Sequence, residues 1–214
     1  MPDESLSDLL GGRKAALDAT APVAGFLAGW LAAGHSIGWG SAAAVLVALA
    51  IAAWRLRRGD RPGAVLIGLL GVCVAALVAL HTGRAEDFFL LRLLSNGASA
   101  LAWLVSIVVR WPLLGVVVGT LLGQKTRWRR DPALLRAYQK GSLVWVLQYV
   151  VRLAVFVPLY LAGQTVALAV TQIALTWPLV AACVAISWWV IRRTLPPGHP
   201  GLRHPSTEQP AVPR

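Results

Sequence analysis

Long apolar runs recur along the chain, and they decide which solvent the protein folds in. The runs cover residues 21–31, 40–54, 63–80, 88–109 with its extension 111–123, 142–162 and 165–191. A helix needs about 20 mostly apolar residues to cross the hydrocarbon core of a membrane. Hydrophobic residues make up 57% of the chain and charged residues only 14%, with a mean hydropathy of +0.65. The sequence therefore predicts an all-α, polytopic membrane protein with about six transmembrane helices.

Basic residues in the short segments between these runs set the predicted orientation. Four arginines fall within residues 55–62, and five further basic residues fall within 124–136. Lys and Arg concentrate on the cytoplasmic side of membrane proteins. We therefore expect both segments, the pair Arg192 and Arg193, and both termini to be cytoplasmic. The predicted extracytoplasmic turns are 34–36, 81–87 and 163–164. The protein is then a multi-pass protein of the plasma (cytoplasmic) membrane.

Residues 88–123 are too long for a single crossing. The stretch would extend about 54 Å as a helix, whereas the hydrocarbon core is about 30 Å thick. Pro112 disfavours helix in the residue before it and removes a backbone donor. We expect 88–109 to cross the membrane and 111–123 to form a re-entrant or interfacial helix on the cytoplasmic side. In the alternative, residues near 100–122 cross, and Arg110 lies deep in the membrane.

Three regions follow from this pattern. Residues 1–18 are a polar cytoplasmic segment, residues 19–193 form the transmembrane domain, and residues 194–214, with six prolines, are expected to be disordered. The formal net charge of +11 does not indicate a nucleic-acid partner, because the basic residues flank apolar runs as the membrane rule requires. The lipid bilayer is the expected partner.

Arg152 is the most costly residue in the predicted crossings. It lies about ten residues from either end of the run 142–162, and an arginine at the membrane centre costs at least about 2.5–3.5 kcal/mol. Gln148 lies one turn earlier. Polar stripes on neighbouring runs include Arg92 and Asn96 on one and Gln172 on another. Such stripes either hold helices together or line a polar cavity.

The densest cluster of ionisable groups lies at a membrane rim. Arg84, Glu86 and Asp87 follow His81 before the fourth long run. The two carboxylates either offset the positive end of the following helix dipole or act as proton donors.

A glycine pattern in 111–123 predicts close helix packing. Gly115, Gly119 and Gly123 recur every four residues, which places them on one helix face where another helix approaches closely. Gly25 and Gly29 repeat the pattern. The glycine face suggests a homo-oligomer or a membrane-protein partner.

The sequence offers no sign of a metal site or a cofactor. Cys73 and Cys183 lie in the middle of apolar runs without a Cys or His at metal-ligand spacing, so we interpret them as small packing residues.

Three motifs resemble a known family. They are Gly-Arg-Ala-Glu-Asp-Phe-Phe at 83–89, Arg-Trp-Pro-Leu at 110–113 and Asp-Pro-x-x-Leu-Arg-Ala-Tyr at 131–138. Together they resemble the DUF3159 family, an actinobacterial integral-membrane family of unknown function, over roughly residues 10–193. The resemblance implies a membrane location and brings no activity. A weaker similarity, to the septation protein A family of inner-membrane proteins, rests on Arg110, Pro112, Leu113, Trp128 and Trp145, and implies a role in envelope maintenance or division.

Two functions are compatible with these observations. The first is a non-enzymatic protein: a permease, a channel component or an envelope scaffold. It rests on the small size, the lack of catalytic motifs and the buried Arg152. The alternative is an intramembrane enzyme acting on a lipid or isoprenoid, with Glu86 or Asp87 as the acid.

Overall fold

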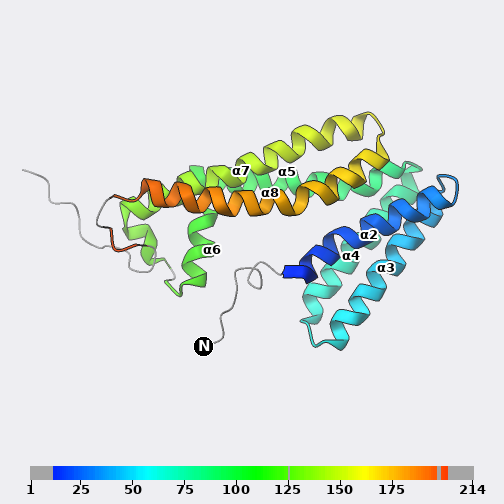
Figure 1. Ribbon diagram of the computed structural model, residues 1–214, viewed down its shortest axis with the longest axis horizontal. Coiled ribbons are helices and arrows are strands. Elements are labelled where there is room, and N and C mark those ends of the chain that lie inside the picture. Colours follow the sequence, from blue (N-terminus) through cyan, green and yellow to red (C-terminus); the bar gives the residue numbers. More distant parts are fainter. Residues whose placement is uncertain (1–11, 125, 197–198, 202–214) are drawn as a thin grey trace, which may run out of the picture. The chain divides into compact units, whose positions relative to one another are not determined.

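The computed structural model describes residues 12–124, 126–196 and 199–201, and every regular element in them is helical. The elements are α2 (Gly12–Ala32), α3 (Ile37–Arg57), α4 (Pro62–Thr82), the 3-10 helix η1 (Ala85–Phe89), α5 (Leu90–Val108), α6 (Leu113–Leu121), the 3-10 helix η2 (Arg127–Arg130), α7 (Pro132–Leu161) and α8 (Thr165–Thr194) (Figure 1). Five stretches are long and apolar enough to cross a membrane: α3, α4, η1 with α5, α7 and α8. The apolar part of α2, Ala19–Ala32, is shorter than these stretches and corresponds to the first of the six predicted helices. The prediction of an all-α polytopic membrane protein is confirmed.

The chain divides into two compact units. Unit 1 comprises Met1–Ser95 and Ala154–Trp177, and unit 2 comprises Asn96–Leu153 and Pro178–Arg214. Helices α5, α7 and α8 each contribute residues to both units. The predicted polar segment at 1–18 and the predicted disordered tail at 194–214 lie mostly outside the described residues.

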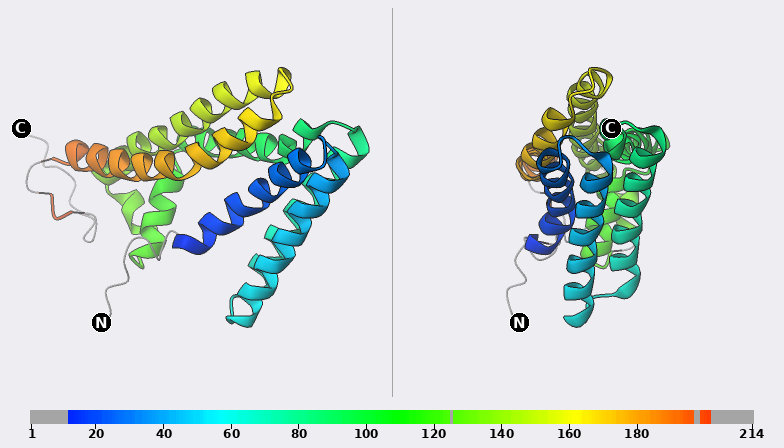
Figure 2. Two further views of the ribbon diagram at one scale, coloured as in Figure 1. Left: turned by 45° about the vertical axis from the view of Figure 1, so that its right-hand side comes forward. Right: turned by 90° about the vertical axis from the view of Figure 1, so that its right-hand side faces the viewer.

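Unit 1 is built on close contacts between α2, α3 and α4. In Figure 2, α2 and α3 lie close together at the turn that joins them and diverge away from it. Gly29 makes this approach possible, because a Cβ there would lie 2.7 Å from the backbone oxygen of Trp39 and 2.7 Å from the Cβ of Ala43. Phe26 is fully buried and stacks on Phe88 with ring centres 4.1 Å apart. Gly29, the second glycine of the Gly25 and Gly29 pattern, therefore allows close helix packing within the chain.

Unit 2 contains the predicted break between the fourth crossing and the short helix. α5 ends at Val108, Arg110 has a φ of +57°, and α6 begins after Pro112. Ser106 spans the break: its backbone oxygen accepts a hydrogen bond from the Trp111 N–H at 2.8 Å, and its hydroxyl accepts one from the Leu113 N–H at 3.3 Å. The break falls where Pro112 predicts it. Residues 100–122 therefore do not form one continuous helix.

Helix α6 is too short to cross a membrane. Its 9 residues extend about 14 Å, against a core of about 30 Å. One face of α6 packs on other elements of unit 2. The ring of Trp128, from η2, covers Gly115, where a Cβ would lie 2.8 Å from the ring, and Leu114 lies against Gly141 of α7.

We predict that Gly29→Ala and Gly71→Ala have opposite effects on stability. The added methyl group at position 29 meets backbone at 2.7 Å, whereas nothing lies within 4 Å of a Cβ at position 71. Gly29→Ala should lower the free energy of unfolding by about 1–3 kcal/mol, since overpacking costs about that much. Gly71→Ala should be neutral or gain up to about 1 kcal/mol from helix propensity. Thermal unfolding of the detergent-solubilised protein measures both, and equal effects would contradict the close α2–α3 contact.

Candidate functional site

The rim cluster of Arg84, Glu86 and Asp87, at η1, belongs to unit 1. Arg84 and Glu86 form an ion pair. The Arg84 Nη2 lies 2.9 Å from Oε1 of Glu86. This hydrogen-bonded carboxylate raises the pKa of the Arg84 guanidinium above its ordinary value. Glu86 also lies beside the α7–α8 turn, since a Cβ on Gly163 would be 3.7 Å from its Oε1. The Glu86 carboxylate is therefore engaged by groups of its own unit.

Asp87 has a different environment from Glu86. It is 4% exposed and accepts a hydrogen bond from the Tyr160 hydroxyl, with the oxygens 2.5 Å apart. Tyr160 comes from the last turn of α7, and the guanidinium of Arg84 lies 5.7 Å from its ring centre. The Asp87 carboxylate thus fastens η1 to the end of α7. Sequence reasoning missed Tyr160, although the predicted topology places it at the same membrane rim as Asp87.

Two further candidate residues lie in unit 1. Arg92 is half-buried in the first turn of α5. Gln172 is buried on α8, and its Oε1 accepts no hydrogen bond from the described residues. Its backbone oxygen accepts one from the Thr176 hydroxyl.

The Arg152 region belongs to unit 2 and is a buried polar stretch of α7. Arg152 is 6% exposed and Gln148, one turn earlier, is 3% exposed. The guanidinium of Arg152 lies 6.0 Å from the ring centre of Tyr149 and within electrostatic range of the Cys183 thiol of α8. The Oε1 of Gln148 accepts no hydrogen bond from the described residues. Asn96 of α5, also in unit 2, is buried as well.

Helices α7 and α8 are held together in unit 2 by side-chain hydrogen bonds to backbone. The Ser187 hydroxyl donates to the Gly141 oxygen at 3.3 Å, and the Cys183 thiol donates to the Val144 oxygen at 3.8 Å. The Ser187 hydroxyl and the Cys183 thiol therefore contribute to helix association. Arg152 and Gln148 follow along the same buried face of α7 and add a cation and an amide to it.

The three glycines of the packing motif have different roles. Gly115 receives the Trp128 ring, and Gly119 is buried on α6. Gly123 lies beyond the end of α6, where it has a φ of +66° and is exposed. Only two of the three therefore lie on the helix face that the spacing predicts, because α6 ends at Leu121.

A small cavity lies within unit 1. It measures about 30 Å³ and is lined by residues of α2, α3 and α4, including Pro22, Ala52, Arg55 and Val72. Among the described residues, no group of three or more His, Cys, Asp or Glu side chains could hold a metal ion.

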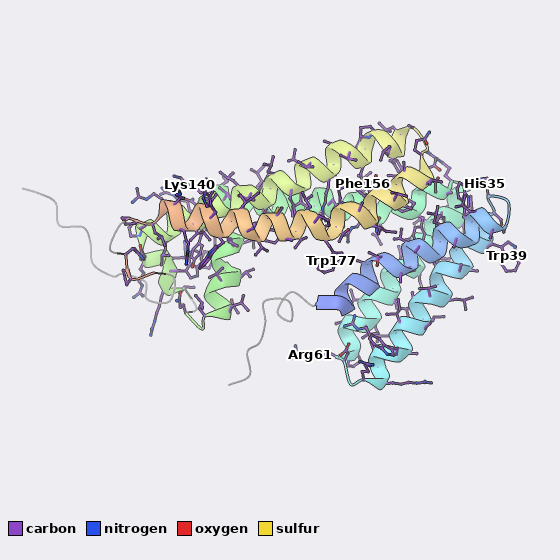
Figure 3. All side chains as sticks on the ribbon, in the orientation of Figure 1. His35, Trp39, Arg61, Lys140, Phe156 and Trp177 are labelled. Carbon is purple, nitrogen blue, oxygen red and sulfur yellow. The ribbon has the colours of Figure 1, made fainter. Side chains whose placement is uncertain are left out.

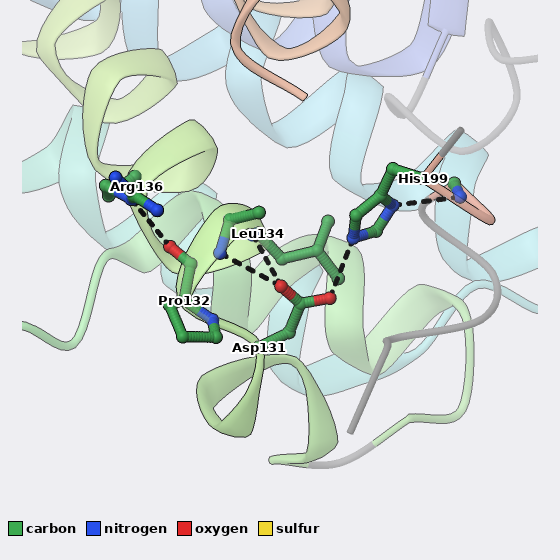
Figure 4. A network of polar contacts seen from close by, with 7 residues as sticks. Asp131, Pro132, Leu134, Arg136 and His199 are labelled. Atoms are coloured by element: carbon green, nitrogen blue, oxygen red, sulfur yellow. Dashed lines mark hydrogen bonds and ion pairs between the residues drawn. The ribbon is translucent and has the colours of Figure 1, made fainter. Parts of the chain in front are cut away.

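An acidic side chain that sequence reasoning did not single out organises one end of unit 2. Asp131 precedes α7, and its Oδ1 accepts hydrogen bonds from the N–H groups of Ala133 and Leu134 at 2.9 and 3.1 Å. Its Oδ2 lies 2.8 Å from Nε2 of His199, in the segment after α8 (Figure 4). Asp followed by Pro is a strong helix-start signal, so the cap was predictable. The contact with His199 was not.

We predict that removing the Tyr160 hydroxyl destabilises unit 1. Tyr160→Phe leaves the buried Asp87 without its donor, which should lower the free energy of unfolding by about 1–3 kcal/mol. Tyr149→Phe, a half-buried tyrosine on the same helix, is the control and should change it little. Unfolding in detergent measures both. In a double-mutant cycle with Asp87→Asn, strictly additive effects would contradict a direct interaction.

We predict that Asp131 stabilises unit 2 chiefly as a helix cap. Asp131→Ala removes the acceptor for two N–H groups and should cost about 0.5–2 kcal/mol. Asp131→Asn keeps the cap and should cost less, and His199→Ala, which removes only the contact after α8, should also cost less. Unfolding free energies rank the three variants. A larger loss in His199→Ala than in Asp131→Ala would contradict this order.

Comparison with known proteins places the chain in a family but assigns it no activity. Neither the curated proteins nor the solved structures contain a match to this chain. A family model described as "Protein of unknown function (DUF3159)" matches residues 10–198, which is most of the 214 residues. That span includes all the described helices, from α2 to α8. The chain is therefore an integral membrane protein of the DUF3159 family.

Proposed function

We propose that the protein is a non-enzymatic component of the plasma membrane that binds and passes a small polar solute, as a permease or a channel component. The observation that supports this best is Arg152, which is 6% exposed in the apolar half of α7. Gln148 and Asn96, both buried in the same unit, supply amide groups. These side chains provide donors and acceptors that a passing solute can use in place of water.

The cost of a buried arginine favours a role beyond packing. An arginine at the membrane centre costs at least about 2.5–3.5 kcal/mol relative to an apolar residue. Helix association in unit 2 is already served by the Ser187 and Cys183 contacts with α7. Leucine would fill the same helix face without that cost. A polar contact with a solute is a function that leucine could not provide.

The geometry of the rim cluster weighs against the enzymatic alternative. A proton donor must reach its substrate, whereas Glu86 pairs with Arg84 and Asp87 receives the Tyr160 hydroxyl. Both carboxylates are accounted for by holding η1 in place. We therefore assign Glu86 and Asp87 a structural role at the start of α5.

A scaffold is the other non-enzymatic form of this proposal. In this form the protein supports envelope maintenance through a membrane-protein partner. The weaker similarity to septation protein A favours this form, and the resemblance to an actinobacterial family is compatible with it. A homo-oligomer formed through Gly115 is disfavoured, because Trp128 of the same chain covers that glycine. An oligomer would use another surface.

We predict that solute flux depends on Arg152. Proteoliposomes containing the purified protein are tested by stopped-flow light scattering with glycerol, urea, chloride and short-chain carboxylates. Arg152→Leu should abolish the flux seen with wild type and should leave the protein folded, and Arg152→Lys should retain part of it. The control is Arg136→Gln, an exposed arginine at the start of the same helix, which should be unchanged.

The outcomes separate the candidate functions. Equal flux in Arg152→Leu and wild type would contradict the role of Arg152. No flux with any solute would leave the scaffold form. A lipid product found in expressing cells, and lost in Glu86→Gln or Asp87→Asn, would instead support the enzyme.

A further inference from the structure

One end of unit 2 carries many exposed cations, and the described residues of this unit include no exposed anion. Eight basic side chains are exposed there: Arg110, Arg127, Arg129, Arg130, Arg136, Lys140, Arg192 and Arg193. Asp131 is the acidic residue in the described part of unit 2, and it is 1% exposed. Its oxygens are occupied by the start of α7 and by His199. The surface therefore presents uncompensated positive charge.

A shared apolar cluster brings these cations together. Trp128 of η2, Leu114 of α6, Tyr138 of α7 and Ile191 of α8 are buried in one core cluster of unit 2. The arginines on either side of Trp128 and after Ile191 lie outward from that cluster and are exposed. Lys140 lies on α7 two residues after Tyr138 (Figure 3). Segments distant in sequence thus present their charges at the same end of the unit.

Exposed tryptophans hold three of the guanidinium groups in place. The Cζ atoms of Arg129, Arg192 and Arg193 lie 3.8, 4.6 and 5.4 Å from the ring centres of Trp111, Trp188 and Trp189 respectively. These tryptophans are 41%, 48% and 57% exposed. A guanidinium stacked on an indole face keeps its N–H edge available for a phosphate.

The combination points to one occupant. Tryptophan favours the head-group level of a bilayer, and α7 and α8 are membrane-spanning by length and composition. Clusters of Lys and Arg on the cytoplasmic side of such helices attract anionic lipids. We propose that this basic, tryptophan-rich end of unit 2 binds anionic phospholipid head groups, with Arg129, Arg192 and Arg193 holding the phosphates. The proposal is independent of solute transport.

The loop between α3 and α4 provides a matched comparison within the same chain. Arg57 ends α3, and Arg58 and Arg61 follow it in the loop. Figure 3 labels Arg61. There, Arg55 pairs with Asp60 at 2.8 Å, so a carboxylate offsets part of the positive charge. Arg58 also stacks on Trp54, with its Cζ 4.4 Å from the ring centre. The loop offers the same number of arginines for substitution and differs from the proposed site in having the Asp60 carboxylate beside them.

The test titrates the purified full-length protein in detergent with phosphatidylglycerol or with phosphatidylcholine, and reads bound lipid by native mass spectrometry. Wild type should prefer phosphatidylglycerol. The triple variant Arg129→Gln, Arg192→Gln, Arg193→Gln should weaken phosphatidylglycerol binding more than about tenfold, because each cation near the surface contributes to the attraction. The triple variant Arg57→Gln, Arg58→Gln, Arg61→Gln should weaken it less, because Asp60 already offsets part of the positive charge of that loop.

A second variant keeps the test valid if the Gln variant folds poorly. Arg129→Lys, Arg192→Lys, Arg193→Lys retains the charge but loses the planar guanidinium, so it should bind phosphatidylglycerol several-fold more weakly than wild type. Unchanged affinity in this variant would overturn the role of the stacked guanidinium groups. So would equal losses in the two Gln variants, or equal binding of the two lipids by wild type. Displacement of the lipid by excess inorganic phosphate would overturn the lipid head group as the occupant.

Discussion

Hydrocarbon offers no water to the backbone, and this constraint shapes every part of the fold. Each N–H and C=O in the membrane must find a partner in the chain, and helices satisfy this requirement internally. Breaks between helices therefore need polar side chains nearby. Ser106 serves the break before α6 with its backbone and hydroxyl oxygens, and the Asp131 carboxylate serves the start of α7.

Side-chain contacts then decide how these helices associate. In unit 1, glycine and alanine let α2 and α3 approach closely, and aromatic rings from η1 fill the space beside them. In unit 2, the Trp128 ring packs directly on Gly115 of α6, the position that a partner helix occupies in a glycine-based dimer. The small residues Gly29 and Gly115 thus pack against other parts of the same chain. The buried polar groups, above all Arg152, are the features that packing explains least.

Much of the fold follows from sequence because its signals are local. Apolar length predicts the membrane-crossing helices, and Pro112 predicts the break before α6. The candidate site is less predictable because it depends on contacts between distant segments. Asp87 and Tyr160, 73 residues apart, meet through the arrangement of η1 and α7, and the end of α6 at Leu121 separates Gly123 from its two predicted companions. Periodicity identified Gln148 and Arg152 as one helix face, since four-residue spacing is itself a local signal.

Two prolines give the longest helices uneven stiffness. Pro158 lies inside α7 and Pro178 inside α8, and neither can donate a hydrogen bond to the carbonyl four residues earlier, at Ala154 and Ala174. The residue ranges of the two units change at Ala154 and at Pro178, which are the same turns. Bending a helix at such a turn disturbs one backbone hydrogen bond fewer than bending it elsewhere. Elastic deformation of α7 and α8 therefore concentrates at these turns, and the stretch of α7 that carries Gln148 and Arg152 stays straight.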